Sequence, residues 1–343
     1  MAILVTGGAG YIGSHTVVEL LNQGEEVVII DNLQTGHENS IKAGTFYKGD
    51  LRDRNFLEEV FSNHEIEAVI HFAASSLVGE SVSKPLDYYE NNLLASHSLV
   101  STMIDHGVNK IVFSSTAATY GEPKQIPIQE RDETNPTSPY GETKLAMEKM
   151  FRWCDGAYGL KSISLRYFNA AGAHPDGEVG EDHNPESHLI PIILQVALGQ
   201  RESIGIFGDD YPTEDGTCIR DYIHVMDLAN AHWLALEHLR RNETSEVFNL
   251  GNGKGFSVKE VIETARHVTG HSILEVVSQR RAGDPAILIA SSEKAQTILG
   301  WKPKYNNLET IIETAWKWHQ SHPNGYEDHK YLKTQSLLQG QEN

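Results

Sequence analysis

The sequence is poor in cysteine and has no long apolar segment. Its 343 residues include only two cysteines, Cys154 and Cys218, too few for a disulfide framework and without a CxxC spacing for zinc. No apolar run approaches the ~20 residues that cross a bilayer. A disulfide-stapled secreted domain and a membrane-spanning protein are therefore excluded. Because a glycine-rich loop begins by Gly7, directly after the first apolar run, the chain is predicted to be cytoplasmic.

Positive charge is also scarce. There are 28 Lys and Arg against 47 Asp and Glu, which gives a formal net charge of −19. Such a protein repels phosphate backbones and anionic lipids, so neither nucleic acid nor a membrane is expected as a partner. The 17 histidines show no HExxH or similar spacing, and no metal site is predicted. The 39% hydrophobic content is ample for a packed core.

Short β-branched segments alternate with longer amphipathic ones in the first half of the chain. Buried strands are predicted at 2–6, 26–30, 68–72 and 110–114, a later strand at 162–167 continues the series, and 45–47 is a possible further strand. Helical patterns occur at 14–23, 56–63, 227–239 and 258–268. Strands separated by helices pair in parallel through right-handed crossovers. The predicted fold class is therefore α/β, a doubly wound parallel (Rossmann) sheet with a smaller C-terminal α/β substrate domain.

The pattern changes after Ala171. Residues 171–188 (AGAHPDGEVGEDHNPESH) are polar, contain prolines and glycines, and have no periodicity. Loops longer than ~12–15 residues inside compact domains tend to be functional. A domain transition is placed at this loop, and weak order is expected after Tyr326. The predicted cofactor domain comprises 1–171 and about 221–252, and the predicted substrate domain comprises 172–220 and 253–343.

A glycine loop joins the first predicted strand to a helix that is expected to start by residue 14. Glycines alone are weak evidence, because they also serve as ordinary turn residues. Between a strand and a helix, however, a tight turn directs backbone N–H groups and the positive end of the helix dipole at one point, which suits a pyrophosphate. The GxxGxxG spacing is one residue longer than GxGxxG. Dinucleotide contacts are predicted from Gly7, Gly10, Tyr11, Ile12 and Gly13.

Acidic residues follow the second and third predicted strands. Asp31 lies 18 positions after Gly13, near the ~20 expected of an acid that accepts hydrogen bonds from a ribose 2′-OH. Its charge would repel a 2′-phosphate, so NAD is favoured over NADP. The ordinary alternative is a strand-end Asp that caps a turn. Asp50 and Leu51 are expected to meet the adenine edge, although Asp is common in loops.

Tyr140 and Lys144 lie four residues apart in SPYGETK, on one face of a helix announced by Ser138-Pro139. A phenol near pKa 10 is a poor base at pH 7, and a neighbouring cation lowers its pKa. Tyr140 is therefore predicted to be the catalytic proton acceptor and Lys144 its activator. Thr116 ends a strand ~25 residues earlier and offers a hydroxyl to the same substrate oxygen. For Thr116 alone, a hydrogen bond to the local backbone is an equally good explanation.

These segments resemble the extended short-chain dehydrogenase/reductase family, and the resemblance covers nearly the whole chain. It rests on TGGAGYIGSH at 6–15, HFAA at 71–74, FSSTAATYG at 113–121, SPYGETK at 138–144 and LRYFNAAGAHPDGEVGED at 165–182. The long loop and IFGDDYPTEDGT at 206–217 resemble the nucleotide-sugar epimerases within that family.

The resemblance implies an activity. Tyr140 would take the proton of the C4 hydroxyl of a UDP-hexose while hydride passes to bound NAD. The 4-keto sugar would then rotate and receive the hydride on its other face, so that UDP-galactose and UDP-glucose interconvert. A homodimer is also implied. Further cofactor contacts are implied at Asn32, Phe72, Ala73, Ala74, Asn91 and Phe168. Substrate contacts, besides Thr116 and Tyr140, are implied at Asn169, His188, Leu189, Phe207, Arg220, Arg281 and Asp284.

Departures from related enzymes narrow the activity. Nucleotide-sugar dehydratases carry an Asp-Glu pair directly after the catalytic Thr, where this chain has Ala117-Ala118. Leu288 matches a position whose bulk helps decide whether an N-acetyl group fits, and its intermediate size leaves N-acetylated UDP-hexoses as alternative substrates. Arg220, taken singly, could instead be an ordinary ion-pair partner of Asp221 or Asp227. A catalytically silent nucleotide-sensing scaffold and a dehydrogenase that releases NADH remain the rival functions.

Overall fold

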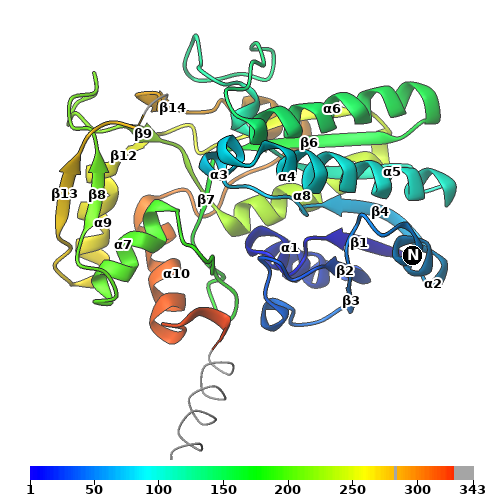
Figure 1. Ribbon diagram of the computed structural model, residues 1–343, viewed down its shortest axis with the longest axis horizontal. Helices are drawn as coiled ribbons and strands as arrows, with labels where there is room; N and C mark the ends of the chain where they lie inside the picture. Colours follow the sequence, from blue (N-terminus) through cyan, green and yellow to red (C-terminus); the bar gives the residue numbers. More distant parts are fainter. Residues whose placement is uncertain (282–283, 328–343) are drawn as a thin grey trace, which may run out of the picture.

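The computed structural model describes residues 1–281 and 284–327, so the expectation for the tail after Tyr326 falls mainly outside the described residues. A seven-stranded parallel sheet, with the order β11–β6–β5–β4–β1–β2–β3, forms its larger part (Figure 1). The strands are β1 (Ala2–Thr6), β2 (Val27–Asp31), β3 (Thr45–Lys48), β4 (Ile66–His71), β5 (Lys110–Thr116), β6 (Lys161–Tyr167) and β11 (Glu246–Leu250).

Helices cover both faces of this sheet, which explains why strands such as β1 and β2 are buried at every position and almost entirely apolar. One face packs against α1 (Tyr11–Asn22) and α8 (Val225–Asn242) through residues such as Leu20 and Leu236. The other face packs against α2 (Arg54–Asn63), α5 (Ala95–Asp105) and α6 (Pro139–Tyr158). Between α2 and α6 lie α3 (Val78–Ser83), α4 (Pro85–Tyr88) and a π-helical turn, η2 (Tyr89–Leu94).

The strand order reverses at β1, which pairs with β2 on one side and with β4 on the other. Ligands of open α/β sheets bind outside the carboxyl ends of the strands at such a switch point. Because all seven strands are parallel, the residues that follow β1, β2, β4 and β5 meet at one edge. The fold thus gathers the glycine loop, Asp31, Phe72 and Thr116 at the same edge of the sheet.

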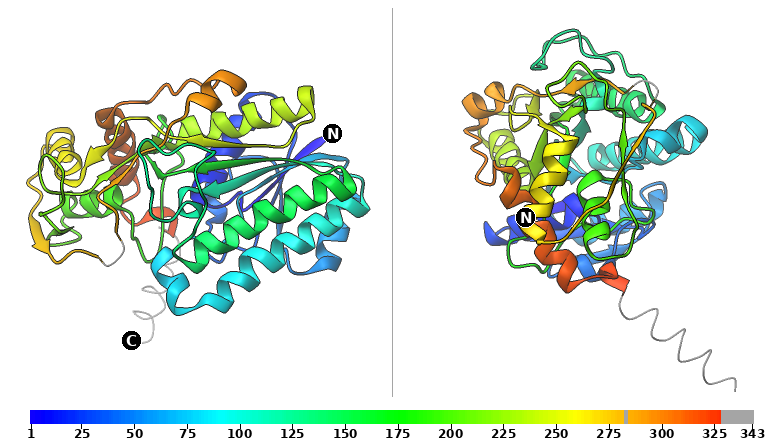
Figure 2. Two further views of the ribbon diagram at one scale, coloured as in Figure 1. Left: turned by 90° about the horizontal axis from the view of Figure 1, so that it is seen from above. Right: turned by 90° about the vertical axis from the view of Figure 1, so that its left-hand side faces the viewer.

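A smaller part lies beside this edge, at the left of Figure 1, around a core that includes Ile193, Ile262 and Ile312 (Figures 1 and 2). Its strands are β7 (Asn169–Ala171), β8 (Ile204–Phe207), β9 (Ile219–Arg220), β10 (Tyr222–His224), β12 (Phe256–Ser257), β13 (Glu275–Ser278) and β14 (Ile287–Leu288). Its helices are α7 (Leu189–Ala197), α9 (Val258–Thr269) and α10 (Leu308–Ser321). Short helical turns elsewhere are η1 (Glu38–Ser40), η3 (Ala117–Thr119), η4 (Ala295–Leu299) and η5 (Gly325–Glu327).

The predicted fold class is confirmed. Residues 246–250 return to the main sheet as β11, beside β6. The long loop is real, since 172–188 contains neither helix nor strand. Helix α1 begins at Tyr11, in agreement with a start by residue 14, and Gly10 serves as its N-cap. Within 1–281 and 284–327, no helix has the length and apolarity to cross a membrane.

Candidate functional site

The glycine loop folds into a tight cradle at the carboxyl end of β1. Gly7 has a left-handed φ of 74°, and a Cβ there would lie 2.5 Å from the backbone nitrogen of Ala73. A Cβ at Gly13 would lie 2.1 Å from the carbonyl oxygen of Gly7. No side chain caps the N-terminus of α1. The positive end of α1 therefore has no capping side chain, which fits a diphosphate at this position.

Asp31 ends β2 and is buried, with 8% exposure. Its Oδ2 accepts a hydrogen bond from the Ala9 N–H in the glycine loop (3.0 Å), and its Oδ1 accepts one from the Leu33 N–H (2.8 Å). Asp31 therefore does cap the turn after β2, as the ordinary alternative for this residue proposed. Burial raises the pKa of Asp31, and these two backbone hydrogen bonds oppose the shift. A carboxylate has further lone pairs, so the contact with a ribose hydroxyl stays a prediction.

Asn32 and Asp50 meet beyond the ends of β2 and β3, where the Asn32 amide donates to Asp50 (3.2 Å). Arg52 forms an ion pair with Asp50 at 2.8 Å and holds the pKa of that carboxyl far below its usual range. The Asp50 carboxylate is therefore engaged by its own neighbours. Leu51 is 5% exposed and belongs to the core below, so its side chain packs inward.

The remaining predicted cofactor residues come from two places. Both Phe72 and Ala73 donate their N–H groups to the Thr6 carbonyl, at 2.9 and 3.1 Å, which brings the segment after β4 against the glycine loop. Ala74 follows on, and Asn91 in η2 donates to the Ser75 hydroxyl (2.8 Å). Phe168 lies between β6 and β7 at the same edge.

Tyr140 and Lys144 lie in the first two turns of α6. Ser138 caps this helix by accepting from the Gly141 N–H (3.2 Å), and Pro139 occupies its first position, as the sequence predicted. The Lys144 ammonium lies 6.0 Å from the centre of the Tyr140 ring and donates to the Ser114 carbonyl at 2.8 Å. Thr116 Oγ1 accepts from the Ala118 N–H (3.2 Å), so the local backbone contact weighed for Thr116 is present.

From the sequence, Lys144 was expected to lower the pKa of Tyr140, but in the folded chain the pKa of Tyr140 is raised. Burial raises the pKa of Tyr140, and a hydrogen bond with Thr116 offsets this only in part. Burial lowers the pKa of Lys144 to about 7, and Glu148 opposes this shift. A lowered tyrosine pKa is therefore not a property of these side chains alone. Burial is the larger cause for Tyr140, and a cationic ligand bound beside the phenol would lower its pKa.

Sequence reasoning missed the buried charge beneath Lys144. Glu148, one helical turn further on, forms an ion pair with Arg166 of β6, and both side chains are less than a tenth exposed. Ser115 donates to the same carboxylate at 2.5 Å. The sequence did contain one indication of this contact, because Lys144 and Glu148 are spaced i, i+4 on a predicted helix and therefore lie on the same face. This network fixes α6 to β5 and β6, and with it the position of the Tyr140 and Lys144 side chains.

Three predicted substrate residues, Asn169, His188 and Leu189, line a cavity of about 40 Å³ between β7, β10 and the start of α7. Asn169 belongs to β7, and its side-chain amide donates to the Asp221 carbonyl at 3.0 Å. His188 precedes α7 and Leu189 begins it. The structure thus brings together residues that come from both ends of the long loop.

The other predicted substrate residues form two pairs. The Arg281 guanidinium lies 3.9 Å from the centre of the Phe207 ring. Arg220 forms an ion pair with Asp284, and its other guanidinium nitrogen donates to the Ile219 carbonyl (2.8 Å). Leu288 lies alongside Arg220 in the β9–β14 pair.

The suggested pairing of Arg220 with Asp221 or Asp227 was wrong. The Asp221 carboxylate accepts backbone N–H groups, including that of Asn252 at 2.7 Å. Asp227 accepts the backbone N–H of Lys304 at 2.7 Å. Both carboxylates are thus satisfied by the backbone.

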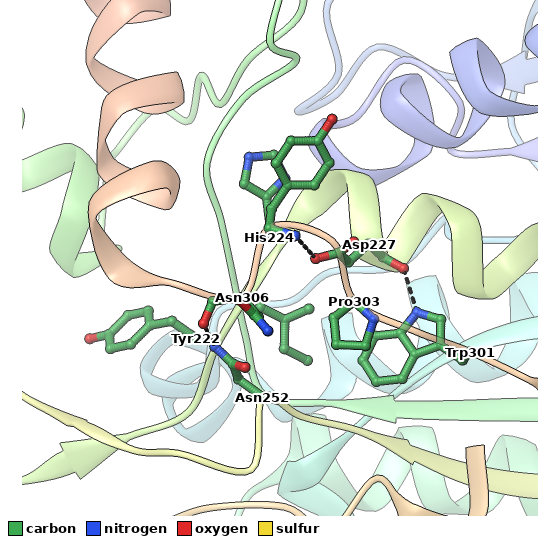
Figure 3. Close-up of a pocket in the computed structure, with 9 residues that line it drawn as sticks. Tyr222, His224, Asp227, Asn252, Trp301, Pro303 and Asn306 are labelled. Carbon is green, nitrogen blue, oxygen red and sulfur yellow. Dashed lines mark hydrogen bonds between the residues drawn. The ribbon is translucent and has the colours of Figure 1, made fainter. Parts of the chain in front are cut away.

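A separate depression near Asp227 is structural. It is lined by residues of β10, α8 and the segment 301–306, and the Trp301 indole donates to the Asp227 carbonyl at 2.9 Å (Figure 3). None of the predicted site residues lines it. These contacts fasten the 301–306 segment to α8.

A doubly wound sheet with a glycine cradle at its switch point, together with a Tyr and a Lys on one face of α6, defines a dinucleotide-dependent α/β enzyme. Residues 3–251 match the NAD dependent epimerase/dehydratase family, and the chain belongs to this family. The resemblance noted from the sequence is thereby confirmed.

The chain is also similar to individual proteins over nearly its whole length. It is 70% identical to a UDP-glucose 4-epimerase of Halalkalibacterium halodurans, over 95% of this chain and 98% of that one. A crystal structure of a UDP-glucose 4-epimerase matches with a TM-score of 0.94 and 59% identity, over 96% of this chain and all of the other. The UDP-glucose 4-epimerase of Bifidobacterium longum, in complex with NAD+ and UDP, matches with a TM-score of 0.90 and 42% identity, over 95% and 100%.

Proposed function

We propose that the chain interconverts UDP-galactose and UDP-glucose, with NAD as its cofactor. One observation carries the proposal: the fold combines a glycine cradle at Gly7–Gly13, a Tyr140 and Lys144 pair in the first turns of α6, and two arginines in the smaller part, Arg220 and Arg281. Two anchoring regions around one proton acceptor suit a reaction between two nucleotides. The high identity to epimerases along the whole chain supports the same function.

The residues of the cofactor side fit NAD. Gly7 and Gly13 keep the cradle free of side chains, Asp31 is tied to that cradle, and its charge opposes a 2′-phosphate. When bound, NAD supplies the acceptor and donor of the hydride. It also supplies the positive nicotinamide ring that the folded chain lacks beside Tyr140, and a cation there lowers a phenol pKa.

Tyr140 performs the proton transfer. Its phenolate takes the proton of the C4 hydroxyl as the sugar is oxidised, and its phenol returns a proton as the sugar is reduced. Thr116 contributes a hydroxyl at the same oxygen, and Lys144, held by Ser114, stabilises the phenolate. Ala117 and Ala118 supply no acid or base for elimination of water, which disfavours a dehydratase.

The second part of the chain anchors the sugar nucleotide. We propose that Arg220 and Arg281 contact the diphosphate and uridine, that Asp284 contacts a ribose, and that 172–220 with 253–343 form the substrate domain. Guanidinium groups suit this task because they bind phosphate in a planar, bidentate geometry. Asn169, His188 and Leu189 line the cavity between β7 and α7. The Phe207 ring packs against the Arg281 guanidinium.

A spectrophotometric assay with UDP-galactose tests the reaction. Formation of UDP-glucose without net NADH is expected. Steady accumulation of NADH would indicate a dehydrogenase, and bound NAD without product would indicate a sensing scaffold. A panel with UDP-N-acetylgalactosamine tests the alternative that Leu288 leaves open, because turnover faster than with UDP-galactose would move the main activity to N-acetylated sugars.

We also propose a cytoplasmic homodimer. Helices α5 and α6 run side by side on the outside of the sheet (Figure 2), and large apolar side chains are exposed there, including Leu94, Trp153 and Tyr158. Trp153 is 76% exposed, which is unusual for tryptophan on a monomer surface. Cys154 and Cys218 are both unpaired, in keeping with a reducing compartment. Sedimentation of the wild type and of Trp153→Glu tests the dimer, which this change should dissociate.

A further inference from the structure

Four potential metal ligands converge in the long segment between β7 and α7. They are Glu181, His183, Glu186 and His188, and one ligand atom of each lies within 4.8 Å of the others. The spacing ExHxxExH falls on a stretch without helix or strand, so it matches no familiar zinc motif. No metal site was predicted from the sequence, because the spacing of these four residues matches no known ligand motif. Only the turn of the backbone between 181 and 188 brings the four side chains together.

The separations within this cluster suit a tetrahedral ion. The Nδ1 atom of His183 lies 3.2 Å from an oxygen of Glu181 and 3.7 Å from an oxygen of Glu186. The Nδ1 atom of His188 lies 3.7 Å from Glu186 and 2.5 Å from Glu181. Zinc bonds of ~2.0–2.2 Å place tetrahedral ligand atoms about 3.3–3.6 Å apart. The 3.2 Å separation matches closely. The two 3.7 Å separations run to different oxygens of Glu186, Oε2 for His183 and Oε1 for His188, so this carboxylate has to turn to place one oxygen near both imidazoles. The contact between His188 and Glu181 would open by about 1 Å.

The charge balance of the cluster demands two positive charges. The side chains of Glu181 and Glu186 are each only 4% exposed. Among the ion pairs of residues 1–281 and 284–327, neither carboxylate has a Lys or Arg partner. Buried carboxylates are costly unless they are compensated. Either two imidazolium protons or one divalent cation meets this need.

One contact favours the cation. The Nδ1 atom of His183 is buried and has no hydrogen-bond partner, although an oxygen of Glu181 is 3.2 Å away. The ring is therefore oriented so that an N–H would not point at the carboxylate. The same arrangement results when the lone pair of His183 Nδ1 and the Glu181 oxygen both point at one metal ion that lies between them.

We propose that Glu181, His183, Glu186 and His188 bind one Zn²⁺ ion. Two imidazoles with two carboxylates suit zinc, whereas Mg²⁺ prefers six oxygen ligands. Four protein ligands close the coordination shell, so the ion is structural. It would hold the segment between the glycine loop, where Tyr11 donates to the Gly172 carbonyl (2.6 Å), and the cavity that His188 shares with Asn169.

Zinc titration of the full-length protein tests this site. The purified protein is stripped with a chelator, its retained NAD is checked, and ZnCl₂ alone is added during calorimetry. One ion per chain is expected with a dissociation constant below about 1 µM, together with a higher unfolding temperature. Mg²⁺ should produce neither effect. With Co²⁺, the wild type should show the intense visible absorption of a tetrahedral site.

Variants distinguish this site from adventitious binding. His183→Asn and Glu186→Gln should each lower the zinc affinity at least 100-fold, whereas Glu178→Gln, an exposed carboxylate in the same segment, should not change it. Wild-type zinc uptake no tighter than that of the two ligand variants would overturn the proposal, as would an octahedral Co²⁺ spectrum. The wild-type stoichiometry and spectrum decide the matter even if a variant fails to fold.

Discussion

The two sides of the active site are built in different ways. The cofactor side consists largely of backbone: a glycine cradle, carbonyl groups at strand ends, and an Asp held by two N–H groups. The sugar side consists of long side chains that satisfy each other, Arg220 with Asp284 and Arg281 with Phe207. A backbone site is rigid before its ligand arrives, whereas paired side chains can exchange partners. That difference suits a reaction in which NAD stays in place while the hexose turns.

Tyr140→Phe should have the largest effect, because it removes the proposed proton acceptor, on which both half-reactions depend. We expect turnover to fall by roughly 10²–10⁴-fold, the range for a lost general base, with bound NAD unchanged. Rates and NAD content are measured together with UDP-galactose. Tyr158→Phe, on the exposed part of the same helix, is the control. A wild-type rate in Tyr140→Phe would remove this residue from the role.

Arg220→Ala should weaken binding of the sugar nucleotide without affecting the binding of NAD. The KM for UDP-galactose should rise by roughly 10–100-fold, because a hydrogen bond to a charged group contributes about 1.5–3 kcal/mol. NAD content should not change. Arg280→Ala serves as the control, since Arg280 is paired with Asp210 outside the predicted site. Equal KM values in the two variants would contradict the anchoring role of Arg220.

Gly13→Ala should break the cofactor side. The added Cβ would lie 2.1 Å from a backbone oxygen that cannot move without disturbing the cradle. We expect a loss of about 1–3 kcal/mol in unfolding free energy, typical of overpacking, and a lower NAD content. Urea unfolding measures the first effect. Gly156→Ala, where a Cβ meets open space in α6, should be neutral or slightly stabilising.

Lys144→Ala should shift the pH dependence of turnover. Without this cation the phenolate of Tyr140 is less stable, so the pH optimum should rise by about one unit and the rate at pH 7 should fall roughly tenfold. A pH series of kcat records both. Lys149→Ala changes an exposed lysine of the same helix and should leave the profile in place. An unchanged profile in Lys144→Ala would exclude activation of the phenol.

Asp31 variants should give the smallest effect. Asp31→Ala removes both the repulsion of a 2′-phosphate and the two hydrogen bonds to the loop. Asp31→Asn keeps an acceptor but removes the charge. Each should reduce the preference for NAD over NADP several-fold in competition binding. If both variants discriminate as the wild type does, the charge of Asp31 does not select the cofactor.

Much of the fold was predictable because local patterns there agree with the tertiary structure. The apolar segments became strands of the parallel sheet, since helices bury both of its faces. Ser138-Pro139 marked the start of α6 because a cap and a proline act through neighbouring backbone groups. Helix α1 starts at Tyr11, before the amphipathic pattern that begins at Ser14, because Gly10 serves as both a turn residue and the helix cap.

Contacts between distant residues were not predictable. Nothing local links Arg220 to Asp284, 64 positions away, and an adjacent aspartate was the natural guess. Likewise, burial raises the pKa of Tyr140 and the hydrogen bond with Thr116 lowers it, and burial is a property of the packed structure.

By itself, the sequence determined the doubly wound sheet, the glycine loop after β1, the Tyr and Lys on one helical face, and the family. These features depend on residues close together in the chain, where spacing and periodicity decide geometry. Tertiary structure alone decided which charges pair, how deeply Lys144 is buried, and that Glu181, His183, Glu186 and His188 converge. Those properties depend on how irregular segments fold onto one another, and no local period encodes that.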